Sequence, residues 1–218
     1  MAAKVSPLSP LALYNLVSAG LWGFFLFRAV NVYPKIGQPA FFYETKGYLT
    51  AIQCGALIEI LNSLLGIVRT PLLTTVAQVA SRLLVTVGIF HYLPEAYNAH
   101  NATFLSLLTA WSVTEIVRYL FYYFNLTAAG GPPKILVLLR YNLFWLLYPM
   151  GVASELLIIY SALPVAEARY SSNVKWALVA SMLFYIPGFP MLYSHMVVQR
   201  KKVMKSLRNA SSTGKKKA

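Results

Sequence analysis

Six long apolar segments follow one another along this chain, and they limit its possible folds more than any other feature. Most are about as long as the ~20 residues that an α-helix needs to cross a bilayer. Hydrophobic residues make up 58% of the 218-residue sequence and charged residues only 11%. A water-soluble domain does not bury so much apolar surface, so we predict an all-α, polytopic membrane protein, a bundle of six transmembrane helices. The expected spans are residues 11–27, 48–68, 72–92, 104–124, 136–160 and 174–198.

Basic residues gather at the C-terminal end of the sequence. Eight of the 19 Lys and Arg residues lie after Gln199. A basic tail beside a membrane span is typical of the cytosolic side, where it contacts anionic lipid, so the net charge of +13 does not indicate nucleic-acid binding. Six spans place both termini on that same side. We therefore expect a cytosolic lead at 1–10, a six-span membrane domain at 11–199 and a basic cytosolic tail at 200–218.

The fifth apolar segment carries an unusual group of polar and helix-breaking residues. Tyr148 and Glu155 are seven residues apart, which on a helix returns to nearly the same face about two turns, or ~10 Å, further on. Pro149 predicts a kink at Tyr148, and Gly151 leaves room for a neighbouring helix or a ligand. An ionisable group inside a span is a functional candidate. The pattern fits an acid/base pocket and fits equally a packing kink whose Glu bonds to a neighbouring helix.

Other charges also lie inside the expected spans. Because Glu115 and Arg118 are three residues apart on one predicted helix, their side chains can meet directly. Structural pairing is the favoured interpretation for Glu59 and Arg82, since buried charges persist mainly when they are paired. Two further Arg-Tyr pairs are candidates for lining a polar site: Arg118 with Tyr119, and Arg140 with Tyr141. The three His residues lack metal-ligand spacing.

Two other classes of protein were weighed. A tyrosine phosphatase needs a low-pKa thiolate in a Cys-x5-Arg loop, but Cys54 is followed six residues later by Ile60 and lies in an apolar segment. A small transporter would account for broken helices with buried Glu residues, although no inverted repeat is visible.

Taken together, several segments resemble the very-long-chain (3R)-3-hydroxyacyl-CoA dehydratase family, also called protein tyrosine phosphatase-like or PASTICCINO-type. The resemblance runs from the first span through Lys202. The sequence departs from the family pattern at Asn62, where His is expected in many members, and at Val87, where Trp is expected. The matching stretches are residues 58–71, Ser81-Arg82, Trp111-Ser-Val-Thr-Glu-Ile-Val-Arg-Tyr119, Arg140-Tyr141, Tyr148-Pro-Met-Gly-Val-Ala-Ser-Glu155 and Tyr185-Ile-Pro-Gly-Phe-Pro190.

The resemblance implies a function and a site. In that family the tyrosine and the glutamate of the Tyr-Pro-x-Gly-x-x-x-Glu pattern are the catalytic pair, which here are Tyr148 and Glu155. The implied reaction is the third step of microsomal fatty-acid elongation, in which a 3-hydroxyacyl-CoA loses water to give a trans-2-enoyl-CoA, with Glu155 as base and Tyr148 as acid. The supporting or substrate-binding candidates are Glu115, Arg118, Tyr119, Arg140 and Tyr141.

The resemblance also implies partners and a location. No metal or redox cofactor is needed beyond the acyl-CoA substrate. The expected partners are membrane lipid and the other elongase enzymes, namely the condensing enzyme, the ketoacyl reductase and the enoyl reductase. We expect a multi-pass protein of the endoplasmic reticulum membrane, with Lys215 and Lys216 matching a dilysine retrieval signal. An inactive scaffold of the elongase complex is the remaining alternative, and the intact Tyr148 and Glu155 argue against it.

Overall fold

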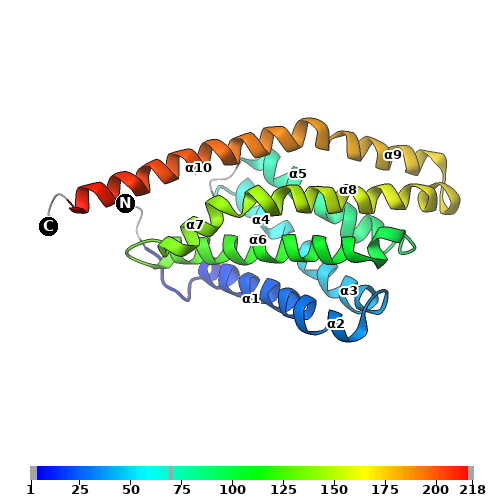
Figure 1. Cartoon of the computed structure of the whole chain (residues 1–218), viewed down its shortest axis with the longest axis horizontal. Coiled ribbons are helices and arrows are strands. Elements are labelled where there is room, and N and C mark those ends of the chain that lie inside the picture. Colours follow the sequence, from blue (N-terminus) through cyan, green and yellow to red (C-terminus); the bar gives the residue numbers. More distant parts are fainter. Residues whose placement is uncertain (1–3, 69–70, 216–218) are drawn as a thin grey trace. The chain divides into compact units, whose positions relative to one another are not determined.

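The computed structural model describes residues 4–68 and 71–215, with side chains as far as Asn209. Every regular element in that part of the chain is a helix, as Figure 1 shows, so the all-α prediction is confirmed. Five helical segments there are long and apolar enough to cross a membrane, which agrees with a multi-pass protein. These segments are Pro10–Ile36, Leu72–Ile89, Ala102–Thr127, Phe144–Arg169 and Ser172–Asn209.

The prediction of six membrane spans is not confirmed, because the second expected span does not form one long helix. Residues 48–68 are divided between helix α3 (Ala40–Gly55) and helix α4 (Leu57–Leu64), which are 16 and 8 residues long. Neither reaches the ~20 residues that a straight crossing needs. Residues 29–46, between the first two expected spans, were expected to form a loop. That prediction was wrong, because α1 (Pro10–Asn31) extends into this stretch and α2 (Tyr33–Ile36) lies within it. Pro34 stands in the first turn of α2, where its missing N–H has no intrahelical acceptor to lose.

The fifth expected span is divided into two helices. Helix α7 (Lys134–Asn142) ends and α8 (Phe144–Arg169) begins around Leu143, whereas Tyr148 and Pro149 lie within the continuous run of α8. The kink expected at Tyr148 stays a prediction. A proline ring clashes with the carbonyl four residues earlier, here that of Trp145, which lies inside α8. The break at Leu143 is further upstream, beyond the turn that Pro149 disturbs.

The sixth expected span is also interrupted, as its Pro-Gly-Phe-Pro sequence predicts. Helix α9 (Ser172–Leu183) and helix α10 (Tyr185–Lys215) meet at Phe184, and Pro190 lies inside α10. Helix α10 continues past Gln199 into the basic segment, drawn from orange to red in Figure 1. The remaining helices are α5 (Leu72–Leu83), the π-helix η1 (Leu84–Ile89), the 3-10 helix η2 (Tyr97–His100) and α6 (Ala102–Thr127).

Two compact units make up the chain, and each is described by itself. Unit 1 comprises Met1–Leu26, Thr109–Val152 and Leu183–Ala218, and within it α7 packs against α10. Unit 2 comprises Phe27–Leu108 and Ala153–Met182, and within it α3 and α5 pack against each other and against η1.

The core of unit 2 is a cluster of buried aromatic rings. The ring of Phe42 meets those of Phe90 and Phe104 edge-on, at centroid distances of 5.2 and 5.3 Å, and Phe41 adds a fourth ring. All four side chains are fully buried. Edge-to-face contacts of this kind stabilise a core beyond the area that they bury. The cluster joins α3, the end of η1 and the start of α6.

Candidate active site

The predicted catalytic residues both lie on α8, but in different units. Tyr148 belongs to unit 1 and Glu155 to unit 2. The Glu155 side chain is buried, with 7% of the residue exposed, and Tyr148 is half-buried. Each residue is therefore considered with the neighbours in its own unit.

In unit 1, the ring of Tyr148 lies against two aromatic rings from α10. Its centroid is 5.2 Å from that of Phe189 and 6.2 Å from that of Tyr193, with interplanar angles of 14° and 27°. These are the distances of offset stacking. Three residues further along α8, a Cβ added at Gly151 would lie 3.7 Å from the Cβ of Ala110 on α6, an ordinary contact. Two small residues thus let α8 approach α6 closely, as the glycine predicted.

In the same unit, Glu115 and Arg118 meet on α6, which confirms the prediction from their spacing. The Arg118 Nη2 atom lies 2.6 Å from Oε2 of Glu115, and Nε donates to the same oxygen at 2.8 Å. Glu115 is completely buried. A buried carboxylate is tolerated when a guanidinium both pairs with it and donates hydrogen bonds to it. Arg118 also lies over the ring of Tyr119, at 4.5 Å from its centroid, which adds a cation–π contact.

Arg140 has a different environment, although it too lies in unit 1. From the last turn of α7 its Nη2 donates to the phenol oxygen of Tyr122 at 3.1 Å. Its guanidinium lies 4.6 and 4.7 Å from the ring centroids of Phe121 and Tyr122, and Tyr141 meets Phe121 edge-on at 6.2 Å. These contacts are with neutral groups, whereas Arg118 is engaged by a carboxylate.

In unit 2, the helix around Glu155 is fixed by hydrogen bonds from two other segments. The Ser154 hydroxyl donates to Ser106 Oγ on α6 at 3.0 Å, and Ser154 is buried. The Asn98 side chain donates to the carbonyl of Leu157 at 2.8 Å, while the Asn98 N–H donates to Ser161 Oγ. These contacts set the rotation of this part of α8 and hence the direction in which Glu155 leaves the helix. The sequence analysis missed them because each joins residues that are far apart in the chain.

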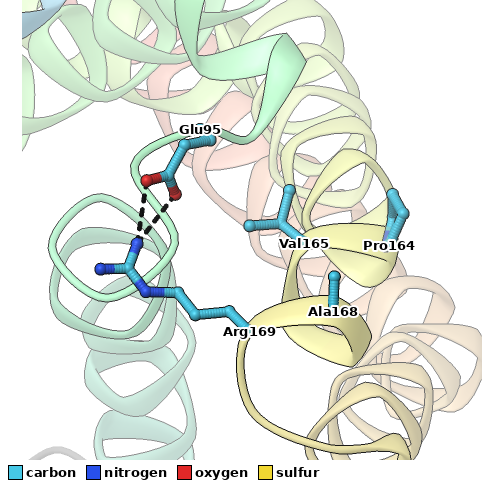
Figure 2. Close-up of a pocket in the computed structure, with 5 residues that line it drawn as sticks. All are labelled: Glu95, Pro164, Val165, Ala168 and Arg169. Carbon is cyan, nitrogen blue, oxygen red and sulfur yellow. Dashed lines mark hydrogen bonds and ion pairs between the residues drawn. The ribbon is translucent and has the colours of Figure 1, made fainter.

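A cavity of about 580 Å³ in unit 2 lies apart from these candidates. Figure 2 shows it beside the end of α8, where Arg169 pairs with Glu95 at 2.9 Å. Glu155 comes ten residues before Val165 on the same helix, which corresponds to about 15 Å of helix rise. The cavity is lined by Glu95, Pro164, Val165, Ala168 and Arg169, none of which is a predicted site residue.

A second cavity in unit 2, of about 410 Å³, is an apolar groove between η1 and α9, with Tyr92 and Tyr170 among its lining residues. Within the described residues, no three His, Cys, Asp or Glu side chains gather in a way that would hold a metal ion. None of the predicted site residues lines either cavity.

Comparison with known protein families decides which family these residues belong to. The family described as "Protein tyrosine phosphatase-like protein, PTPLA" matches residues 53–206. The chain belongs to the PTPLA family. The matched region contains Tyr148, Glu155 and all five supporting candidates, so the resemblance proposed from the sequence is confirmed. The phosphatase chemistry in the family's name has no counterpart here, because Cys54 lies on α3 and is followed by Ile60 where that chemistry needs Arg.

Curated proteins that are similar to this chain carry the name of an enzyme. A protein of Schizosaccharomyces pombe named "Probable very-long-chain (3R)-3-hydroxyacyl-CoA dehydratase" is 38% identical over 93% of this chain and 96% of its own length. The Arabidopsis thaliana dehydratase PASTICCINO 2 is 34% identical over 89% of this chain and 92% of its own. The human very-long-chain (3R)-3-hydroxyacyl-CoA dehydratase 2 is 36% identical over 89% of this chain and 80% of its own length. No solved structure matches the chain.

Proposed function

We propose that this protein is a very-long-chain (3R)-3-hydroxyacyl-CoA dehydratase, a hydro-lyase of fatty-acid elongation. One observation carries the proposal: the chain aligns over nearly its whole length with dehydratases from fungi, plants and animals. The intact Tyr-Pro-Met-Gly-Val-Ala-Ser-Glu pattern at 148–155 supports it. The substrate is a long-chain 3-hydroxyacyl-CoA, and the product is the trans-2-enoyl-CoA.

The reaction requires two proton transfers, and we assign one to each residue of the pair. Glu155 takes the proton from Cα of the substrate, the Cα–Cβ double bond forms, and the C–O bond at Cβ breaks. Tyr148 donates its proton to the departing hydroxyl, which leaves as water. One positioned acid or base contributes about 10²–10⁴-fold to such a reaction. No electrons are gained or lost overall, so the proposal invokes no redox cofactor, and it assigns both proton transfers to side chains rather than to a metal ion.

The supporting candidates receive different roles. As Cα loses its proton, negative charge develops on the thioester oxygen, and a fixed positive charge lowers the barrier to that step. We assign this role to Arg140, whose contacts are a phenol and two aromatic rings. We assign a stabilising role on α6 to Arg118, which pairs with Glu115 and lies over the ring of Tyr119. Tyr141 packs against Phe121, the ring that Arg140 also contacts.

The distribution of charge supports a place for the CoA group. Unit 1 contains 12 Lys and Arg residues and one Glu, whereas unit 2 contains seven Lys and Arg residues and five Glu residues. In our proposal the CoA phosphates bind basic side chains of unit 1, and the acyl chain lies among apolar helices. Arg200 on α10 is a candidate, because its Nε donates to the neutral Asn142 side chain at 2.9 Å.

A direct assay tests the proposed function. The purified protein in detergent is expected to convert a long-chain 3-hydroxyacyl-CoA to the enoyl-CoA, measured by the absorbance of the conjugated thioester. The same protein in sealed liposomes is expected to show no substrate-dependent flux. Flux without dehydration would identify a transporter, and neither activity in a folded sample would identify a scaffold.

We further propose the endoplasmic reticulum membrane as the location, with both termini in the cytosol and the other elongase enzymes as neighbours. The basic residues of α10 support this orientation. Six crossings require that α3 and α4 together make the second span. The dilysine pattern begins at Lys215, and its second residue, Lys216, lies outside the described residues.

Glycosylation tests the proposed orientation. Asn-x-Ser/Thr sequons occur at Asn101, Asn125 and Asn209, and only Asn101 would be luminal. We expect Asn125 and Asn209 to remain unmodified when the protein is expressed in eukaryotic cells. The measurement is whether glycosidase treatment lowers the apparent mass of the protein. An acceptor segment inserted into the 94–101 loop is the control and should be modified. A glycan on Asn125 or Asn209 would reverse the orientation.

A further inference from the structure

Three aromatic rings in unit 1, those of Tyr148, Phe189 and Tyr193, form a stack. Phe189 and Tyr193 lie nearly parallel to each other, with centroids 5.4 Å apart and an interplanar angle of 19°, and Tyr148 is nearly parallel to both. The phenol proposed as the proton donor is thus held against a flat aromatic surface from another helix. Two side chains of α10 therefore contact the ring of Tyr148.

The local sequence of α10 explains why the two rings share a face. Phe189 and Tyr193 are four residues apart, the spacing that brings side chains together on one side of a helix. The helix starts at Tyr185, directly after the interruption at Phe184, so both rings lie near its beginning. Pro187 falls in the first turn, where its missing N–H has no intrahelical partner to lose.

Tyr193 is itself held by α8. The rings of Phe144 and Trp145 meet it edge-on, at centroid distances of 5.7 and 5.5 Å with interplanar angles of 69° and 89°. The guanidinium of Arg200, two turns further along α10, lies 6.0 Å from the centroid of Trp145. Two rings at the start of α8 therefore pack against Tyr193. Tyr193 and Phe189 in turn stack on Tyr148.

We infer that Phe189 and Tyr193 are positioning residues for Tyr148, fixing the direction of its phenol oxygen toward the leaving hydroxyl. The inference rests on the proposed function, because it matters only if Tyr148 donates a proton. Tyr148 is half-buried, and its phenol oxygen moves when the side chain rotates about the Cα–Cβ bond. Stacking on two rings limits that rotation, and misplacing a reacting group by about 1 Å can cost about 10²-fold in rate.

Removing a ring is the first part of the test. Phe189→Leu and Tyr193→Leu are each expected to lower kcat about 10-fold or more with little change in KM, because they disturb the proton donor and leave substrate binding intact. Tyr193→Phe and Phe189→Tyr keep the stacked ring and should retain near-normal kcat. Phe184→Leu is the matched control, since that ring precedes the same helix and is 76% exposed.

Coupling to Tyr148 is the deciding part. In a Tyr148→Phe background the phenol oxygen is absent, so Phe189→Leu should cost no further turnover. An equal fold-loss in both backgrounds would assign Phe189 a general structural role and overturn the inference. If Phe189→Leu does not fold, Phe189→Met removes the ring while keeping most of the volume. If Tyr148→Phe itself has normal turnover, Tyr148 is not the proton donor, and both its catalytic assignment and this inference are rejected. That result differs from the one above, which rejects only the positioning role of Phe189.

Discussion

Glu155→Gln is expected to lower the turnover of a long-chain 3-hydroxyacyl-CoA by about 10²-fold or more. Gln has almost the same size as Glu and forms hydrogen bonds, but it does not take up a proton in the accessible pH range. If Glu155 removes the Cα proton, the variant loses the whole contribution of one general base. The measurement is the rate of enoyl-CoA formation by purified variant in detergent, normalised to folded protein.

A matched control separates this effect from a loss of stability. Glu167 lies on the same helix, is exposed and pairs with Lys175 at 2.6 Å, so Glu167→Gln removes a carboxylate that has no part in the proposed reaction. A surface pair of this kind contributes little to stability, and turnover should be unchanged. If Glu155→Gln keeps near-normal turnover while melting at a lower temperature, the residue is structural. Glu115 and Arg118 are then the next polar group to test.

Tyr148→Phe is expected to lower turnover by a similar factor of about 10² or more. The change removes one hydroxyl and little volume, and the ring that stacks on Phe189 remains. The leaving hydroxyl then lacks its positioned proton donor, which is the usual contribution of one general acid. The same assay measures it. Tyr160→Phe is the control, because that residue is also on α8 and is 64% exposed.

The double variant provides an independent test of the pair. When two groups act together in one chemical step, the effects of removing them do not add. The double variant Glu155→Gln/Tyr148→Phe should therefore be barely slower than the slower single variant. Two losses that multiply would mean that the residues act in separate steps or through stability. That result would leave each residue important but would remove the paired mechanism.

Part of this structure follows from the sequence because the interactions concerned are local. The length and composition of the apolar segments predict a helical membrane protein, since only helices and closed barrels satisfy backbone groups inside a bilayer. The ion pair of Glu115 with Arg118 follows from a spacing of three residues on one helix. The break near Phe184 follows from two prolines and a glycine within four residues. The candidate pair follows from a pattern in eight consecutive residues.

Other features depended on packing between distant segments. The sequence did not predict the break between α7 and α8 at Leu143, which lies beyond the turn that the ring of Pro149 disturbs. The sequence also left open whether residues 48–68 form one helix or two, because Gly55, where α3 ends, lowers helix propensity by only about 1 kcal/mol relative to Ala.

The tertiary structure also decided what surrounds each candidate side chain. The stack of Tyr148 with Phe189 and Tyr193 joins residues more than 40 positions apart, and the hydrogen bond of Ser154 to Ser106 joins residues 48 positions apart. An i, i+4 aromatic pair beside a helix break was visible in the sequence, but nothing local showed which ring it would meet. The sequence by itself thus determined the helical class, the family resemblance and the residues with reactive groups. Only the tertiary structure decided their partners, because contacts between helices depend on how each helix is rotated and where it is interrupted.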